Sequence, residues 1–209
     1  MNPLAPTGPL TPLRPLPDNA LPALPIDELV FKRRSTRHYD FERPVPFSDF
    51  STLLDRSSRG SAVDCLALDA PPLHDLYLIV HNVEGLRDGI YLHHPQLHSV
   101  ELLREGIFRQ QATRIAVEQE YAGAAHVNCY YLTDLTPVLE RYGNRGYRLA
   151  QLECALHAGK LQLAAHALGL GTVGSTSFDD EVIEFFSPHA AAKSYMFVVV
   201  FGVRQARAG

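Results

Sequence analysis

The chain has 209 residues, of which 46% are hydrophobic and 20% charged, and its formal net charge is -4. This length and composition predict one soluble globular domain with enough sequence to bury a sizeable core. The weak acidity argues against a nucleic-acid partner, because nucleic-acid-binding domains usually carry a basic surplus. No apolar run approaches the roughly 20 residues that span a bilayer, and no signal-peptide pattern is present, so we expect a cytoplasmic protein with no membrane partner.

The cysteines Cys65, Cys129 and Cys154 are odd in number, lie far apart and include no C-x-x-C spacing. Without a secretion signal, this pattern indicates reduced thiols rather than a disulfide framework. We expect the three thiols to be free and buried.

Residues 1–26 differ in composition from the rest of the chain. Prolines occupy every third position from 3 to 15, which is the repeat of a polyproline II helix, and more prolines follow at 17, 22 and 25. Two interpretations stay open: a disordered leader, or an extended arm whose leucines lie on a partner subunit. We therefore divide the chain into a Pro-rich arm, residues 1–26, and a domain, residues 27–209.

The first part of the domain predicts two short helices and then strands. Asp27 caps a helix that ends in a cluster of arginines, and Ser48 caps a second helix over 49–58. The segment between these helices is predicted to be extended. Strand-like runs follow at 75–83 and 89–94, and the chain then turns and returns as another strand.

The next part alternates helix and strand. Residues 101–122 are predicted as helix and residues 126–134 as a buried strand. A further helix has Thr136 as its cap, Pro137 at its first position and Gly143 as its stop.

A long helix begins near residue 148 and ends at Gly169 or Gly171. It is apolar on nearly every face, so we expect it at the centre of the domain or at a subunit interface. A short strand or loop at 172–177, a helix at 179–186 and a buried strand at 194–203 complete the chain. Helices and strands are mixed without strict alternation, which predicts an α+β layered domain.

Two short patterns resemble a dinucleotide site and a metal site, but the predicted elements around each pattern argue against that site. The run GLGTVG matches G-x-G-x-x-G, but a helix precedes it and a strand follows, which is the reverse of a dinucleotide fold. The run HHPQLH holds His93, His94 and His98, but its proline and flanking strands favour a solvent-exposed hairpin turn over a metal site. Glu153 and His157 share a helix face without a second ligand pair, so we expect no metal.

The run FKRRSTRH concentrates positive charge where a helix gives way to an extended segment. It contains Arg33, Arg34, Ser35 and Arg37 within five positions. Guanidinium groups are forks that match phosphate oxygens, and a serine hydroxyl adds a donor. The run is therefore either a phosphate site or a solvated helix end.

Longer segments resemble a known family. RRSTRHYDFERPVPFSDFSTLLDRSS resembles the opening of the FMN-dependent nitroreductases. VEGLRDGIYLHHPQLHSVELL, RYGNRGYRLAQLECALHAGKLQLAAHALGLGTVGSTSFDDEVIEFF and MFVVVFGV resemble the branch that contains SagB-type peptide-azoline dehydrogenases. The resemblance covers about residues 27–204. It implies a layered α/β/α sandwich with a central, mostly antiparallel sheet, and a homodimer with FMN at the interface.

The resemblance also implies roles for single residues. The residues that match the FMN phosphate and ribityl binders are Arg33, Arg34, Ser35 and Arg37. The residues that match the loop over the flavin near N5 are Ser175, Thr176 and Ser177. Tyr142 matches the tyrosine of a Lys-Tyr pair linked to azoline oxidation, and Arg141 stands in the place of the lysine. Arginine cannot serve as a base near neutral pH, so we expect no azoline oxidation.

The implied activity is ping-pong electron transfer. NAD(P)H passes hydride to flavin N5 and leaves, and a small acceptor such as a quinone or nitroaromatic then takes the electrons. The segment before the strand at 75–83 departs from the branch, and so does Thr176, which replaces a glycine. Two alternatives therefore stay open: a degenerate member that binds flavin weakly or acts as a scaffold, and a phosphate- or nucleotide-binding module unrelated to redox chemistry.

Overall fold

A central antiparallel sheet organises the computed structural model, which describes residues 4–60, 63–67 and 70–206. Within these residues the strand order is β1-β4-β3-β2-β5-β7-β6, and every neighbouring pair is antiparallel. The strands are β1 Leu10–Pro12, β2 Asp75–Val80, β3 Gly89–His94, β4 Ser99–Glu105, β5 Val127–Thr133, β6 Gly171–Ser175 and β7 Ser194–Gly202.

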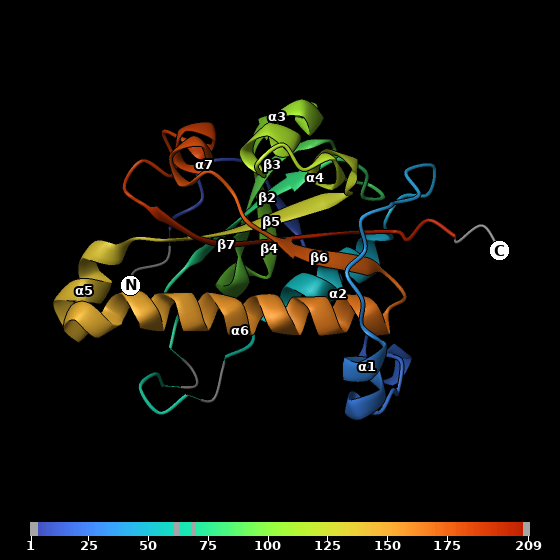
Figure 1. Cartoon of the computed structure of the whole chain (residues 1–209), viewed down its shortest axis with the longest axis horizontal. Coiled ribbons are helices and arrows are strands. Elements are labelled where there is room, and N and C mark those ends of the chain that lie inside the picture. The colour runs from blue at the N-terminus through green and yellow to red at the C-terminus, as the bar shows by residue number, and fades with distance from the viewer. Residues whose placement is uncertain (1–3, 61–62, 68–69, 207–209) are drawn as a thin grey trace.

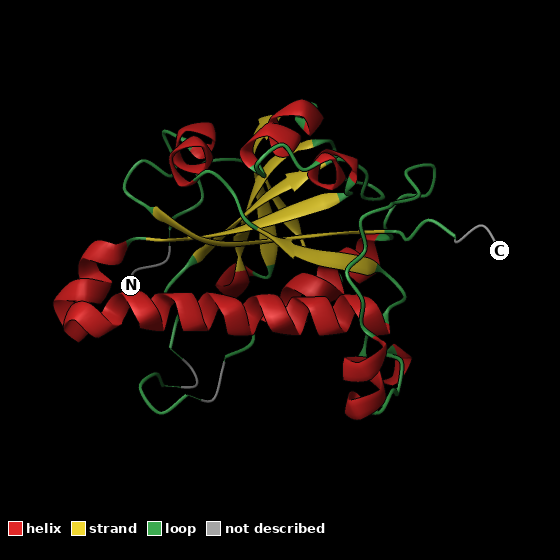
Figure 2. Ribbon diagram, viewed as in Figure 1, coloured by secondary structure: helices red, strands yellow, loops and turns green. Residues whose placement is uncertain are grey.

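Helices cover both faces of the sheet (Figure 1). They are α1 Ile26–Lys32, α2 Phe47–Ser58, α3 Arg109–Ile115, α4 Glu120–Ala124, α5 Leu135–Tyr142, α6 Gly146–Ala167 and α7 Asp179–Phe186. The long helix α6 lies under one face with α2 and α5, and α3, α4 and α7 lie over the other (Figure 2). The predicted α/β/α layering and antiparallel sheet are therefore confirmed.

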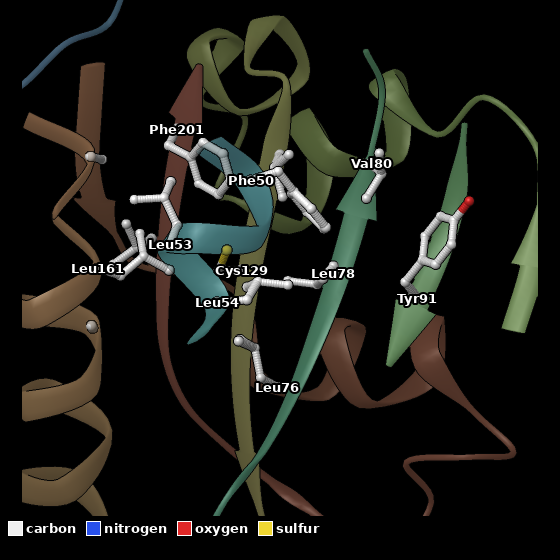
Figure 3. Close-up of a cluster of buried hydrophobic side chains, with 14 of the residues drawn as sticks. Phe50, Leu53, Leu54, Leu76, Leu78, Val80, Tyr91, Cys129, Leu161 and Phe201 are labelled. Atoms are coloured by element: carbon white, nitrogen blue, oxygen red, sulfur yellow. The ribbon is translucent and has the colours of Figure 1, made fainter. Parts of the chain in front are cut away.

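The larger part of the core lies between the sheet and the layer of α2 and α6. Phe50, Leu53 and Leu54 on α2 are fully buried, and they point at the sheet beside Leu161 of α6 (Figure 3). A second apolar cluster, centred on Tyr130 of β5, packs beneath α3, α4 and α7. Adjacent residues of β5 point to opposite faces of the sheet, so this strand contributes to both clusters.

Helix ends follow the predicted signals to within two residues. The helices for which Asp27 and Ser48 were predicted as caps begin two residues earlier, with Pro25 and Pro46 at the cap positions. At α5 the cap is Asp134, whose carboxylate accepts a hydrogen bond from the N–H of Thr136 at 3.0 Å. The glycine stops are Gly143, with φ +59°, and Gly169, with φ +81°, a region in which glycine is unstrained.

The helix predicted over 101–122 is wrong. Its first residues complete β4, which ends at Glu105, and only the short helices α3 and α4 follow. Gly106 has a φ of +148°, and Val117 and Glu118 have φ values of +56°, so the backbone leaves the helical region on each side of α3. Strand pairing of β4 with β3 outweighs the local helix propensity there.

The Pro-rich arm is ordered against its own subunit. Residues 10–12 form β1 and pair with β4 at the edge of the sheet. The buried carboxylate of Glu101 accepts hydrogen bonds from the backbone N–H groups of Thr7 at 2.6 Å and Gly8 at 2.5 Å. The interpretation of a disordered leader is therefore wrong for this part of the arm, and the described arm lies on its own sheet.

The expectations for the cysteines and for the histidine-rich turn have mixed outcomes. Cys65, Cys129 and Cys154 are free, but Cys65 is exposed. His93 and His94 are buried in β3 and only His98 is exposed at the turn, so the solvent-exposed hairpin is wrong for two of the three histidines. No group of three or more potential ligands in the described residues could hold a metal ion. No helix in the described ranges is both long and apolar enough to cross a membrane.

Candidate functional site

The arginine-rich segment is held at the ends of β6 and β7. The N–H of Thr36 donates a hydrogen bond to the carbonyl oxygen of Thr172 at 2.9 Å, and Ser35 forms a parallel bridge with Thr172. Further along, Tyr39 forms an antiparallel bridge with Arg204, which follows β7. These contacts fix the backbone between α1 and α2 against one edge of the described sheet.

A glycine makes this close approach possible. A Cβ built on Gly171 would lie 2.5 Å from the Cγ2 of Thr36 and 2.6 Å from its Oγ1. No larger residue fits there unless the segment moves away. Gly171 is therefore required for packing, whereas the helix stop that the sequence assigned to Gly169 or Gly171 belongs to Gly169.

Positive charge gathers around His166 in the last turn of α6. Burial lowers the pKa of His166, and the positive charges of Arg204, Arg33 and Arg34 add to this effect. Arg204 donates to the carbonyl oxygen of Leu170 through Nε at 2.9 Å and through Nη2 at 2.7 Å, and Nη2 also donates to Nδ1 of His166. The sheet thus brings Arg204, from the C-terminal end of the chain, into the predicted cluster.

The arginines of this cluster lack acidic partners. Within the described residues, the guanidinium groups of Arg33 and Arg37 form no hydrogen bond or ion pair, and Arg34 donates only to the carbonyl oxygens of Phe31 and Arg33. The adjacent Lys32, in contrast, pairs with Glu28 at 2.6 Å. Arg33, Arg34 and Arg204 near His166 therefore form a candidate anion site, because a bound anion would relieve the mutual repulsion of guanidinium groups that lack acidic partners.

Strand β6 connects this anion site to the loop of Ser175, Thr176 and Ser177. Thr172 and Ser175 are three residues apart, or about 10 Å along a strand. The hydroxyl of Ser175 lies 2.7 Å from that of Tyr121 on α4, which orients the start of the loop. Thr176 is exposed, whereas Ser177 is buried and its hydroxyl has no hydrogen-bond partner among the described residues.

The predicted catalytic pair lies at the other end of α6. Arg141 is exposed, and its guanidinium carbon is 5.2 Å from the ring centre of Tyr142 at the end of α5. Helix α6 has 22 residues, so its two ends are about 33 Å apart. Within one chain, the structure therefore does not bring Arg141 and Tyr142 to the arginine cluster (Figure 1).

Sequence reasoning missed two residues of the cluster, His166 and Arg204. The available signals were a histidine in the last turn of the long helix and an arginine directly after the last strand. Neither signal predicts that these two residues lie near Arg33, because their proximity depends on the position of β7 between β5 and β6 in the sheet. Strand order is the information that the sequence pattern lacks.

An antiparallel sheet between two helical layers, with a basic cluster beside an edge strand, defines a layered α+β protein with a candidate anion site. A model of the nitroreductase family matches residues 30–203, and the chain therefore belongs to the nitroreductase family of oxidoreductases.

Similar proteins agree with this assignment. A candidate nitroreductase of Methanocaldococcus jannaschii is 27% identical over 173 residues, which are 80% of this chain and 85% of that protein. The solved structure of a candidate nitroreductase from Anabaena variabilis has a TM-score of 0.79 and 25% identity, and the match covers 96% of this chain but only 42% of that chain. A Ralstonia eutropha structure has a TM-score of 0.72 and 19% identity, with 99% and 96% covered.

Proposed function

We propose that this chain is an FMN-dependent oxidoreductase that transfers electrons from NAD(P)H to a small acceptor such as a quinone or a nitroaromatic. The observation that carries the proposal is the group of arginines without acidic partners beside β6, the strand that leads into the loop at 175–177. If the arginine run were only a solvated helix end, there would be no reason for Arg204, from the C-terminal end of the chain, to lie beside it.

The residues of the site fit the two ends of FMN. Arg33, Arg34 and Arg37 offer guanidinium groups to a terminal phosphate, and Arg204, whose Nε and Nη2 already donate to Leu170 and His166, adds positive charge. The buried hydroxyl of Ser177, which lacks a partner among the described residues, offers one hydrogen bond to the ring or ribityl chain. Bound FMN would supply the redox chemistry, taking up hydride and releasing electrons, while the protein supplies placement and electrostatics.

Each part of the chain has a distinct task in this proposal. Thr172 and Gly171 hold the arginine segment in place, and the Tyr121–Ser175 hydrogen bond fixes the start of the loop.

A solved nitroreductase of Clostridium difficile that is named FMN-dependent shares the fold, with a TM-score of 0.57, 13% identity, and 86% and 87% of the two chains covered. It supports the choice of FMN by analogy of fold.

A homodimer is part of the same proposal. The outward face of α5 and α6 exposes large apolar side chains, namely Leu139 at 40%, Tyr147 at 49%, Leu152 at 50% and Leu156 at 36%. Leu152 and Leu156 are one helical turn apart and share a side of α6, and exposed apolar side chains that adjoin in this way are typical of a protein interface. A second copy on this face would cover these side chains, and it is the partner's Arg141 and Tyr142 that we place near the flavin.

The main rival is a degenerate family member. The observation that favours it is the segment at 66–74, which stands in place of a segment expected at the flavin ring, and whose Leu73 N–H donates to Glu153 in the N-terminal half of α6 at 2.8 Å. The uncompensated arginines disfavour it.

Turnover distinguishes the two functions. With the purified full-length protein and added FMN, we expect NAD(P)H-dependent reduction of a quinone, and no oxidation of a thiazoline-containing peptide, because Arg141 cannot accept a proton. Flavin-loaded protein that reduces no acceptor would support the degenerate alternative. Peptide oxidation by the wild type would contradict the role given to Arg141.

A further inference from the structure

Three buried polar side chains to which the proposed function gives no task form a chain of hydrogen bonds. They are Glu153 and His157, one turn apart on α6, and His74, directly before β2, and each is at most 6% exposed. Glu153 lies 3.2 Å from Nδ1 of His74, and Nε2 of His74 lies 3.3 Å from Nδ1 of His157. Buried ionisable groups that are linked in this way can pass a proton from one to the next.

The backbone fixes the carboxylate end of this chain. The N–H of Leu73 donates to Oε2 of Glu153 at 2.8 Å, and this is the same oxygen that His74 contacts. The position of the His74 ring is therefore set on both sides, by Glu153 and by His157.

The pKa values of the two histidines fix where the protons lie. Burial opposes a charge on His74, but the neighbouring Cys154 and Glu153 raise its pKa to about 10. Burial, followed by the charge of His74, lowers the pKa of His157 to about 4. Near neutral pH, His74 therefore carries protons on both nitrogens and donates to Glu153 and to His157. A neutral His157 that accepts on Nδ1 has its own proton on Nε2.

The far end of the chain meets a pocket. A cavity of about 320 Å³ lies between the start of β2, the end of β3 and α6, and the rings of His74 and His157 form part of its wall. Because Nδ1 of His157 is taken by His74, Nε2 is the nitrogen that remains for a molecule in the cavity. Pro71 and Pro72 also line it, and they belong to the segment that stands in place of one expected at the flavin ring.

The proposed reaction needs a proton at such a place. Reduction of a quinone to a hydroquinone takes up two electrons and two protons. The electrons and one proton arrive together as hydride, which bound FMN would supply. The second proton has to come from a donor beside the acceptor, and a positioned histidine is the side chain that most often has this task.

We propose, on the basis of the proposed function, that Glu153, His74 and His157 form a proton relay that protonates the acceptor. The N–H bond at Nε2 of His157 breaks, its electron pair stays on the ring, and an O–H bond forms on the quinone. Nδ1 of His157 then takes the proton from Nε2 of His74, which becomes neutral and keeps its other proton on Nδ1 beside Glu153. Water returns one proton to the relay after each turnover. His157 is the catalytic residue, and His74 and Glu153 are positioning residues that act through it.

A second pair of histidine and glutamate lines the same pocket and provides a matched control. Nε2 of His94 lies 2.7 Å from Oε2 of Glu101, and both side chains are buried. The other oxygen of Glu101 accepts from Thr7 and Gly8 of the arm. No third titratable group in the described residues continues this pair through a hydrogen bond, so we expect it to anchor the arm and not to move protons.

The test compares two acceptors. FMN-loaded protein is reduced with NADPH without oxygen and is then mixed with a water-soluble quinone, which takes up protons, or with ferricyanide, which takes up electrons alone. In His157→Gln the amide keeps a hydrogen bond to His74 but releases no proton near neutral pH. We expect quinone reduction to slow roughly 10²-fold, at the lower end of the range for general acid catalysis, and ferricyanide reduction to keep its rate. His94→Gln should leave both rates unchanged.

Nitrogen NMR of the protein without FMN gives a readout that needs no turnover. At pH 7 we expect protons on both ring nitrogens of His74, and on Nε2 alone for His157. Glu153→Gln removes the carboxylate charge and should lower the pKa of His74.

Three results would overturn the relay: quinone reduction by His157→Gln at the wild-type rate, an equal loss of rate in His94→Gln, or a neutral His74 at pH 7. Wild-type protein that reduces ferricyanide but not the quinone also contradicts the relay, whereas failure with both acceptors contradicts the proposed function and the relay with it. Melting temperatures show whether each variant is folded. If His157→Gln does not fold, the protonation states in the wild type decide the matter.

Discussion

The N–H of Thr36 donates a hydrogen bond to the carbonyl oxygen of Thr172 at 2.9 Å, and this bond fixes the arginine segment to the edge strand β6. The bond forms only because the next residue back along β6 is Gly171, whose missing side chain leaves room for Thr36. The candidate anion site therefore depends on a backbone contact as well as on the arginines.

Gly171→Ala tests this dependence. A Cβ 2.5 Å from Thr36 forces the segment away from β6, and overpacking of this kind costs about 1–3 kcal/mol of unfolding free energy. We expect a lower melting temperature and weaker FMN binding. Gly159→Ala in α6 is the control, since its added Cβ meets no atom within 4 Å and should stabilise the helix slightly. Equal FMN affinity in the two variants would refute the link between Gly171 and the site.

Arg33→Ala and Arg37→Ala test the phosphate assignment directly. Each is expected to weaken FMN binding by about 1.5–3 kcal/mol, the range for hydrogen bonds to charged groups. Lys32→Ala is the control, because Lys32 already pairs with Glu28 and lies outside the motif. A fluorescence titration of FMN measures the three affinities. The assignment is wrong if all three variants bind FMN as tightly as the wild type.

The dimer is tested on the outward face of α6. Replacing both Leu152 and Leu156 with glutamate puts charges where we place the second copy. Burying unpaired charge is costly, so the dimer should dissociate at least about tenfold more readily. Leu97→Glu, at an equally exposed leucine in the turn between β3 and β4, is the control. Sedimentation at micromolar concentration gives the mass, and a monomer with fully bound FMN would contradict the shared site.

The N-terminal arm is expected to contribute to stability. Deleting residues 1–22 removes β1 and leaves the buried carboxylate of Glu101 without its bonds to Thr7 and Gly8. Hydrogen bonds to a charged group contribute about 1.5–3 kcal/mol, and each kcal/mol shifts the melting temperature of a chain this long by about 2–4 °C. An unchanged melting temperature would show that the arm is dispensable.

Stability should fall in acid because of His81. Burial lowers the pKa of His81 to about 4. The hydrogen bond to the carbonyl oxygen of Ala125 opposes this shift, whereas the charges of Arg109 and His126 add to it. An unfolded histidine has a pKa near 6.5, so the unfolded state binds the proton first and stability is lost as the pH falls from about 6.5 toward 4. The slope from this residue is at most about 1.4 kcal/mol per pH unit.

Urea unfolding at pH 7.5 and pH 5 measures this slope. His81→Gln should reduce this slope. If the His81 variant loses as much stability in acid as the wild type, the buried neutral imidazole is not the cause.

Much of the fold could be predicted because local signals were strong. The fully buried strand β5 and the stop at Gly143 follow directly from apolar runs and glycine. The return of the chain as a strand was predicted, but the second half of β4 was assigned to a helix, because the buried Glu101 owes its place to the arm, more than ninety residues earlier. When the partner of a charged residue is not known, a strand that contains the residue resembles a solvent-exposed helix in sequence.

The candidate site, too, could be predicted from the sequence only in part. Arg33 and Arg37 stood out in the sequence because several arginines are adjacent, whereas Arg204 and His166 join them only through the strand order. The sequence singled out His157 on one helix face with Glu153, four residues before it. The residue that links them in space is His74, which precedes β2 and carried no signal of its own.

The absorbance spectrum of freshly purified protein tests the central claim most directly. We expect a yellow protein with the blue-light absorption of bound FMN, which bleaches when NADH or NADPH is added without oxygen. Arg33→Ala purified in parallel should be paler. A colourless protein that also fails to bind added FMN would contradict the account.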